Sequence, residues 1–270
     1  MTFQTVVDLY NKAMDVEDPR TANWPLMSSP LPTLTMVLSY IIFVTFGPRL
    51  MRNRDAFNPY WLLVFYNFGL VILSFYMMVE ILLSASSIPG FKYLCNGVDP
   101  GNHPSVIRLA SACWLFYVSK FVEYLDTVFF VLRKKNNQIT FLHVYHHTSV
   151  CIMWWIFVKW TPGGSMYIGM AFNSLVHVFM YSYYMVSALG PQYRKYLWWK
   201  KYLTSLQLIQ FIIAIVYVVN AVMFHKDCTF PRWAFALLFG YTISLFLLFL
   251  NYYIKEYINR ANEKRKLHNQ

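Results

Sequence analysis

Seven runs of predominantly apolar residues constrain the fold of this chain more than any other feature. Each run is about 20 residues long, which is the length that an α-helix needs to cross a bilayer. The runs lie at about residues 31–48, 60–84, 109–132, 139–158, 165–188, 202–224 and 233–254. The sequence therefore predicts an all-α membrane protein with seven transmembrane helices.

Composition agrees with a protein that is surrounded by lipid. Hydrophobic residues make up 57% of the 270 positions and charged residues 13%, against about 25% charged in a soluble domain. The net charge of +11 is also typical of nucleic-acid-binding proteins, but here the basic residues form short clusters between the apolar runs. We therefore predict a lipid bilayer, and no nucleic acid, as a partner.

The distribution of polar residues divides the chain into three parts. Residues 1–30 are polar and charged and carry no signal-peptide pattern, so we expect a non-cytosolic N-terminal segment there. Residues 31–258 hold all seven runs and form one transmembrane domain. Residues 259–270 are expected to form a basic cytosolic tail.

Charges in the loops predict the orientation. The loops after the first, third and fifth runs, together with the tail, hold 15 of the 23 Lys and Arg residues. The opposite loops hold seven, and Lys120 lies inside a run. The positive-inside rule places the more basic side in the cytosol. The C-terminus is then cytosolic, and seven crossings put the N-terminus on the other side.

Two of the four cysteines fall in loops on the non-cytosolic side. Cys95 follows the second run and Cys228 follows the sixth, whereas Cys113 and Cys151 lie within runs. If that side is oxidising, a Cys95–Cys228 disulfide can form. The alternative is two unrelated free thiols.

Four of the runs carry polar side chains, which are expensive inside a bilayer and therefore indicate function. They are Lys120, Glu123, Asp126 and Thr127 in the third run, His143, His146 and His147 in the fourth, Asn173, His177, Tyr181 and Tyr184 in the fifth, and Gln207 and Gln210 in the sixth. Spacings of three or four residues put each group on one helix face. We predict that the four faces surround one polar cavity that is open to the cytosol.

Most of these residues also have a structural explanation. Lys120 and Glu123 could form a buried ion pair, and the glutamines could hydrogen-bond between helices. His177 alone would most often be a core histidine with satisfied hydrogen bonds. The segment "HVYHH" is different, because three imidazoles in five residues of an apolar run are poorly explained by packing.

Clustered histidines first suggest a metal site. The pattern HxxHH also occurs in membrane di-iron desaturases, which use several such boxes. Here only His143, His146, His147 and His177 lie within runs, which is too few for that centre. A single zinc ion stays open as an alternative, but we predict no metal. Imidazole can instead act as a nucleophile or a general base near neutral pH.

Four motifs, in this order and spacing, carry a resemblance to a known family. They are "KFVEYLDT", "HVYHH", "NSLVHVFMYSYY" and "TSLQLIQ". Together they resemble the ELO family, the elongases of very-long-chain fatty acids. The chain looks most like animal members of subtype 4, with subtype 7 next, over residues 20–258.

The resemblance implies a fold, a reaction and a location. Family members are endoplasmic-reticulum membrane enzymes with a lumenal N-terminus, in which six of the seven helices form a barrel of two inverted three-helix units around a substrate tunnel. They condense an acyl-CoA with malonyl-CoA to a 3-ketoacyl-CoA, CO2 and CoA. No cofactor is implied. A homo-oligomer and the other enzymes of the elongation cycle are implied partners, and a loop disulfide like the one considered above is found in the family.

The resemblance also implies roles for particular residues. His146 would take the acyl group as an acyl-imidazole, His177 would assist proton transfer, and Asn173 could bind a developing oxyanion. His143 and His147 would orient this pair. A one-step condensation with histidine as the base is the competing mechanism, and a metal-dependent lipid oxidase is a more distant alternative. Substrate and CoA contacts are assigned to Lys120, Glu123, Asp126, Arg133, Lys134, Lys135, Tyr181, Tyr184, Lys200, Lys201, Gln207 and Gln210.

Overall fold

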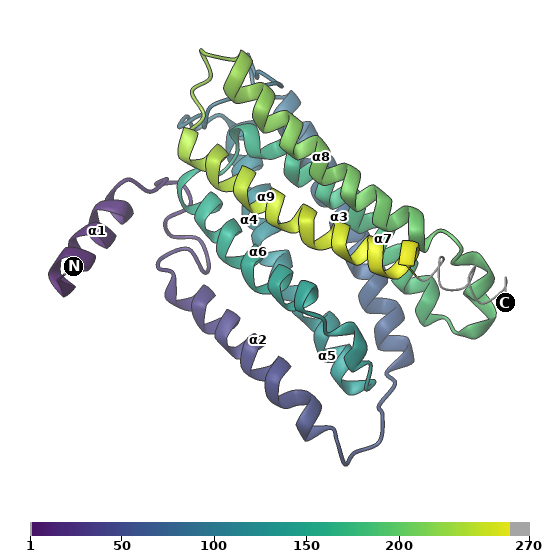
Figure 1. Ribbon diagram of the computed structural model, residues 1–270. Helices are drawn as coiled ribbons and strands as arrows, with labels where there is room; N and C mark the ends of the chain where they lie inside the picture. Colours follow the sequence, from purple (N-terminus) through teal and green to yellow (C-terminus); the bar gives the residue numbers. More distant parts are fainter. Residues whose placement is uncertain (1, 260–270) are drawn as a thin grey trace.

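The computed structural model describes residues 2–259, and within this range the chain is all-helical, without strands (Figure 1). The helices are α1 (Phe3–Asp15), α2 (Leu31–Leu50), α3 (Tyr60–Ser86), α4 (Pro104–Val122), α5 (Tyr124–Leu132), α6 (Phe141–Trp160), α7 (Tyr167–Ala188), α8 (Lys200–Phe224) and α9 (Arg232–Tyr253). Short 3₁₀ turns cover Asn136–Gln138, Gly164–Met166 and Pro191–Tyr196, and a π turn covers Ile254–Asn259. Nearly all of the predicted basic tail, 259–270, lies outside the described residues.

Several helices have the length and composition of membrane spans. Within residues 2–259, four candidates can cross a bilayer by these two criteria: Leu31–Leu50, Tyr60–Ser86, Lys200–Phe224 and Arg232–Asn259. Large apolar side chains such as Trp61, Phe65 and Val216 stand exposed on them, as expected of surfaces that face lipid. The chain is therefore a multi-pass membrane protein. The other three predicted runs are also helical, but their buried Lys, Glu and His residues make them more polar.

The third predicted run is not one helix. It is divided at Glu123 into α4 and α5, where the backbone N–H of Asp126 bonds to the Glu123 carbonyl at 3.1 Å, in an i→i−3 pattern. Such tightening inside a helix often occurs at functional positions. The apolar pattern alone could not predict the break, because the hydrophobicity continues across it.

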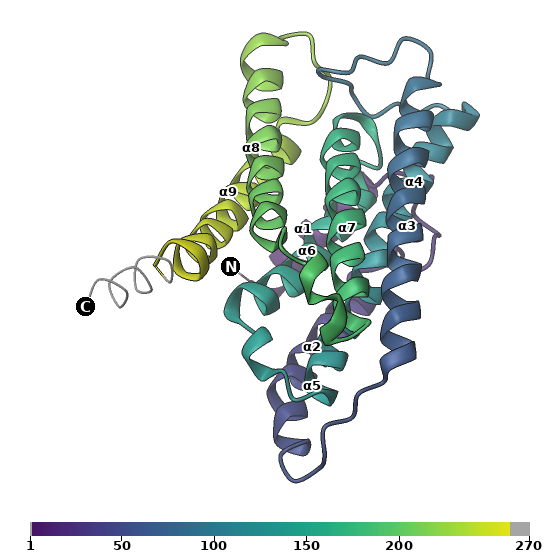
Figure 2. The ribbon, with the colours of Figure 1, turned by 90° about the vertical axis from the view of Figure 1, so that its right-hand side faces the viewer.

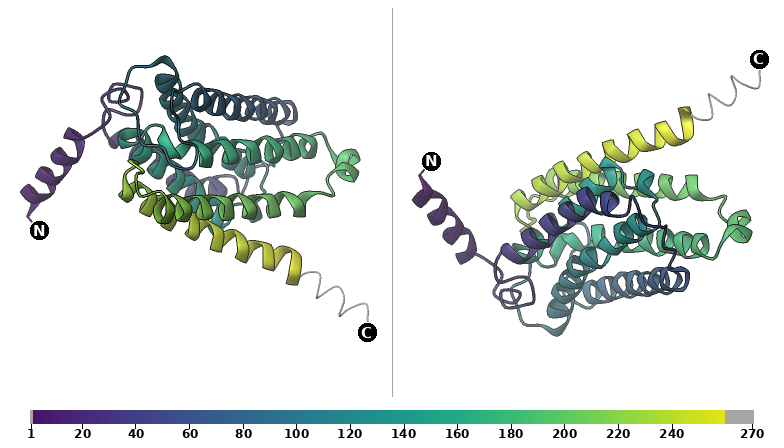
Figure 3. Two further views of the ribbon diagram at one scale, coloured as in Figure 1. Left: turned by 90° about the horizontal axis from the view of Figure 1, so that it is seen from above. Right: turned by 90° about the horizontal axis from the view of Figure 1, so that it is seen from below.

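The helices pack in a continuous series of neighbours. α3 lies along both α4 and α7, α4 also contacts α6, and α8 packs between α7 and α9 (Figure 2). α6 contacts α9 on one side and α2 on the other. α1 projects away from the bundle, except at its last turn, where Nε1 of Trp160 in α6 donates to the Ala13 carbonyl at 2.8 Å (Figure 3).

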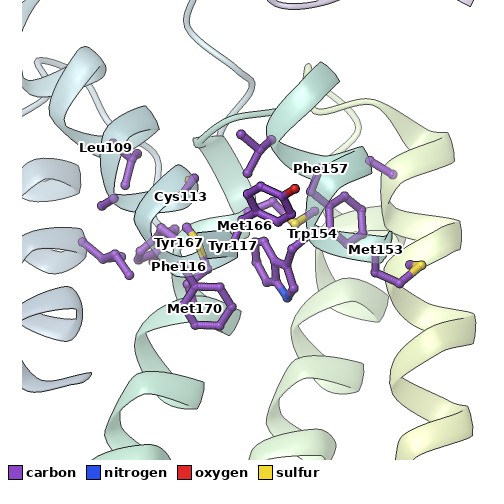
Figure 4. Close-up of a cluster of buried hydrophobic side chains, with 14 of the residues drawn as sticks. Leu109, Cys113, Phe116, Tyr117, Met153, Trp154, Phe157, Met166, Tyr167 and Met170 are labelled. Atoms are coloured by element: carbon purple, nitrogen blue, oxygen red, sulfur yellow. The ribbon is translucent and has the colours of Figure 1, made fainter. Parts of the chain in front are cut away.

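Apolar side chains of α4, α6 and α7 form a large part of the core (Figure 4). Phe116 and Trp154 meet with ring centroids 4.5 Å apart, and Trp154 contacts Phe157 at 5.5 Å. Cys113 and Cys151 are buried free thiols. This core fixes α6 and α7 relative to α4, which carries the polar residues described below.

The two loops at one end of the bundle are linked covalently. Cys95 and Cys228 form a disulfide with Cα atoms 5.6 Å apart. Beside it, Lys92 Nζ lies 3.2 Å from Asp227 Oδ2, and this hydrogen bond lowers the pKa of the Asp227 carboxyl. We call this the disulfide end, and the opposite end, where α5 ends and α8 begins, the basic end.

The segment before α2 is packed onto the disulfide end rather than extended. Lys159, whose side chain is fully buried at the end of α6, donates to the carbonyl of Met27 at 2.7 Å and pairs with Glu17. Asp18 forms a two-pronged ion pair with Arg20, at 2.6 and 2.9 Å. The sequence predicted only a polar segment here.

Candidate active site

The histidine triplet occupies the first turns of α6. Thr140 caps this helix by accepting a hydrogen bond from the backbone N–H of His143 at 3.2 Å. The cap sets where the helix begins, and hence which way each imidazole points. At about 100° per residue, His146 and His147 point in different directions.

Two of the three imidazoles are held within the protein. His143 Nε2 lies 2.7 Å from the hydroxyl of Thr127, which lies 2.9 Å from the hydroxyl of Tyr40. The rings of His143 and His147 are 4.3 Å apart. His147 is 6% exposed and is flanked by the rings of Tyr40 and Tyr124. These two histidines are therefore positioned by their neighbours.

His146 is the triplet member that reaches open space. It lines a cavity between α6 and α7 that α4, α8 and α9 close, and the side-chain amides of Asn173 and Gln210 line the same cavity. Phe116, Trp154 and Phe211 contribute to its mostly apolar wall. The cavity volume is about 80 Å³, so a long acyl chain fits only if side chains along it move apart.

An ion pair and an imidazole meet at the break between α4 and α5. Lys120 Nζ lies 2.7 Å from Glu123 Oε1, and the same oxygen lies 3.3 Å from His177 Nδ1. Lys120 also reaches the Asn173 amide oxygen at 3.4 Å. Lys120 and Glu123 are 1% and 2% exposed, so water screens this pair little.

Asp126 extends this contact between α5 and α7. It accepts a hydrogen bond from the hydroxyl of Tyr181 at 3.0 Å, and both residues are buried. The predicted polar faces of the third and fifth runs therefore do meet. Thr127 is the exception, because it bonds toward α2 and α6 instead of toward α7. Its spacing in the sequence had predicted a shared face with Lys120 and Glu123.

The remaining polar residues of the fifth and sixth runs lie in different places. Gln210 lines the cavity, whereas Gln207 donates to Met180 Sδ at 3.8 Å. Tyr184 is 37% exposed and contacts the ring of Tyr181 at 6.0 Å. Of this group, only Gln210 lines the cavity.

The predicted basic residues stand at the basic end, apart from the buried network. Lys134 donates to the carbonyl of Arg52 at 3.2 Å, and Lys200 lies 3.5 Å from Glu256. Lys201 Nζ stands 5.8 Å from the centre of the Tyr253 ring. Arg133 is half-buried, and Lys135 is exposed. The residues assigned to substrate and CoA therefore fall into two groups, because Lys120, Glu123, Asp126 and Tyr181 belong to the buried network, whereas the contacts of Lys134, Lys200 and Lys201 are at the basic end.

Sequence reasoning missed the aromatic residues that hold the triplet. Tyr40 and Tyr124 lie in apolar runs where tyrosine is ordinary, so no signal marked them. Among the described residues no group of three or more His, Cys, Asp or Glu side chains has the arrangement of a metal site. The predicted lack of a metal stays a prediction.

The fold and the site together define a class of protein. It is a multi-pass helical membrane protein in which buried imidazoles lie beside an apolar cavity. Residues 25–265 match the model of the ELO family, described as the GNS1/SUR4 family. The chain is 47% identical over 251 residues to very long chain fatty acid elongase 4 of Homo sapiens, covering 93% of this chain and 79% of the relative. Very long chain fatty acid elongase 7 of Rattus norvegicus is 44% identical over 253 residues, covering 93% of this chain and 89% of the relative. The chain therefore belongs to the ELO family.

Proposed function

We propose that this chain is the condensing enzyme of fatty acid elongation, which joins a long-chain or very-long-chain acyl-CoA to malonyl-CoA. The names of its relatives support elongation of fatty acids. The observation that carries the proposal is the position of His146 on the wall of an apolar cavity. To transfer an acyl chain from a thioester, an enzyme needs a nucleophile such as imidazole and an apolar cavity that holds the chain.

The first half-reaction is an acyl transfer. A ring nitrogen of His146 attacks the thioester carbonyl, the C–S bond breaks, and CoA leaves as a thiol with the proton from the imidazole. An acyl-imidazole is open to hydrolysis, so the apolar wall protects it by excluding water.

The second half-reaction forms the carbon–carbon bond. Malonyl-CoA loses CO2, and the resulting enolate carbon attacks the acyl carbonyl while the C–N bond to His146 breaks. One proton is taken up overall, and the products are 3-ketoacyl-CoA, CO2 and CoA. The Asn173 amide stabilises the developing oxyanion from the cavity wall.

The other polar residues position this chemistry. Glu123 accepts from Nδ1 of His177, which leaves Nε2 of that ring for proton transfer. Lys120 links Glu123 to Asn173. We accordingly assign positioning roles to Lys120, Glu123 and Asp126, in place of the CoA contact expected from their sequence. On α6, His143 bonds to Thr127 and His147 packs near Tyr40, and these contacts fix the start of the helix that carries His146.

Two other mechanisms make different predictions. In a one-step condensation a histidine acts only as a base, and no acyl-enzyme forms. A metal-dependent lipid oxidase would require a bound metal. A base would need the same place on the cavity wall as a nucleophile, so release of CoA from acyl-CoA alone is what separates the two histidine mechanisms.

We further propose the architecture and orientation that the family resemblance implies. α3, α4 with α5, α6, α9, α8 and α7 would form a six-helix barrel, because each contacts the next around the series, and α2 would lie outside it. Two inverted units, from α3 to α6 and from α7 to α9, would make up the barrel. All seven runs would cross the endoplasmic-reticulum membrane, with the N-terminus lumenal and the C-terminus cytosolic.

CoA would bind at the basic end, which faces the cytosol in this orientation. Phosphate groups need cations, and Arg133, Lys134, Lys135, Lys200 and Lys201 supply them there. We propose no cofactor. A second copy of the chain and the other enzymes of the elongation cycle are the proposed partners.

The direct test is to incubate purified protein with long-chain acyl-CoA and labelled malonyl-CoA in the absence of a reductase. A labelled 3-ketoacyl-CoA two carbons longer than the acyl substrate is expected. Absence of this product across a range of chain lengths would contradict the proposal.

A further inference from the structure

A second cavity opens on the outer surface of the bundle, near the disulfide end. Its volume is about 530 Å³. Small-molecule sites in proteins have volumes of roughly 300–1,000 Å³. α3, α4 and the segment before α2 form its walls, and none of its lining residues lines the cavity of His146. A cavity open to the side of a membrane protein is available to lipid.

A charged pair lies in this cavity. Arg108 donates from Nε and Nη2 to the two carboxylate oxygens of Glu80, both at 2.8 Å. The Arg108 side chain is nevertheless 49% exposed, and among residues 2–259 no group bonds to its Nη1. Charged residues on membrane helices are costly and mark functional sites. Arg108 therefore has N–H groups free for an oxyanion while it stays paired.

Three aromatic rings share the cavity with this pair. Trp24 and Trp114 meet edge to face with centroids 6.0 Å apart, and Tyr76 is 53% exposed. Trp114 is held in place because its Nε1 donates to the Pro25 carbonyl at 2.9 Å. Aromatic rings beside a carboxylate are the usual environment for a quaternary ammonium group.

The depth of these groups suits the headgroup region of a bilayer. Glu80 lies six residues before the end of α3 and Arg108 four residues after the start of α4, or about 9 and 6 Å along the helix axes. Trp and Tyr concentrate at the same level of membrane proteins. The rest of the cavity wall includes the apolar side chains of Met77, Ala112 and Leu115, against which acyl chains can pack.

We propose that this cavity binds a phospholipid with a phosphocholine headgroup, taken from the leaflet at the disulfide end. The free N–H groups of Arg108 bind the phosphate, and the aromatic rings with Glu80 bind the quaternary ammonium. Phosphatidylglycerol fits less well, because its headgroup carries the phosphate but no cation for Glu80 and the rings.

The test uses the full chain in nanodiscs with a phosphatidylcholine that carries a diazirine on its acyl chain near the glycerol. Labelled peptides are mapped by mass spectrometry while unlabelled phosphatidylcholine or phosphatidylglycerol competes. Labelling is expected within residues 76–80 and 107–115, with phosphatidylcholine about tenfold the better competitor, as the loss of one charge-assisted contact implies. Uniform labelling of the exposed helix faces, or equal competition by both lipids, would overturn the proposal.

Two variants separate the site from general lipid contact. Arg108→Gln removes the positive charge that binds the phosphate. Ile107→Trp fills the cavity and leaves the charged pair intact, so the proposal can still be tested if Arg108→Gln does not fold. Each is expected to reduce labelling about tenfold. Ile72→Trp is the matched control, because Ile72 is 53% exposed and lies outside the cavity. Labelling that falls equally in this control would contradict a specific site.

Discussion

The Nδ1 atom of His177 lies 3.3 Å from Oε1 of Glu123, which also lies 2.7 Å from Nζ of Lys120. A carboxylate on one ring nitrogen fixes the tautomer of an imidazole and leaves the other nitrogen for chemistry. The ion pair therefore does more than hold α4 in place: it orients a second imidazole next to Asn173, which lines the cavity of His146.

The first prediction concerns Glu123→Gln. The rate of 3-ketoacyl-CoA formation should fall about 100-fold, the lower end of what a positioned acid or base contributes. Stability in detergent should also fall, by about 3–5 kcal/mol, because Lys120 is left buried without its carboxylate.

A double variant separates the two effects. Lys120→Met combined with Glu123→Gln removes both buried charges, so the thermal unfolding temperature should recover much of its loss. Activity should stay low, since His177 still lacks its carboxylate. Recovery of activity together with stability would mean that Glu123 has only a structural role.

The second prediction concerns the length of the acyl chain. Ala214 lines the cavity one helical turn beyond Gln210, so Ala214→Phe should obstruct the path of the chain. We expect turnover of the longest acyl-CoA substrates to fall about tenfold or more, as one to three kcal/mol of misfit implies, while shorter substrates are affected less. Val216→Phe on the same helix is the control, because Val216 is 59% exposed. Equal loss with all chain lengths would contradict an acyl chain in this cavity.

The third prediction concerns the attachment of the N-terminal segment. Lys159→Met removes a fully buried ammonium that binds both Met27 and Glu17, and should destabilise the protein by about 3–5 kcal/mol. Lys92→Met removes an ion pair whose side chains are 65% and 79% exposed, so it should barely change the unfolding temperature. If both variants lowered the unfolding temperature by similar amounts, burial of the ion pair would not determine how much it stabilises the protein.

The fourth prediction concerns metals. Purified active protein should contain far less than one equivalent of iron or zinc, and chelators should leave its elongation rate unchanged. Stoichiometric iron whose removal abolishes activity would contradict the imidazole mechanism and favour a lipid oxidase.

Much of this fold follows from periodicity in the sequence. The apolar runs predicted the helices, because few structures other than a membrane helix accept so long a run. Spacings of three and four residues predicted that Lys120 and Glu123 would share a face, and that Asn173 and His177 would do so too. The structure brings those two faces together.

Other features depend on contacts that the sequence does not encode locally. The break at Glu123 involves contacts with α7, and the packing of residues 16–30 depends on Lys159, more than 130 positions away. Helical spacing also could not separate His146 from His143 and His147. That distinction depends on Thr127, which bonds to His143 from α5, and on Tyr40 of α2, whose ring packs near that of His147.

His146 is proposed to carry the acyl group between the two half-reactions. To test this, the protein is mixed with acyl-CoA alone, the released CoA is quantified, and an acylated peptide is sought by mass spectrometry. Acyl transfer to His146 predicts about one equivalent of CoA, the burst expected of an acyl-enzyme, and an adduct on His146 that is absent in His146→Ala. An enzyme that makes 3-ketoacyl-CoA but neither releases CoA without malonyl-CoA nor becomes acylated would contradict the claim and establish the one-step route.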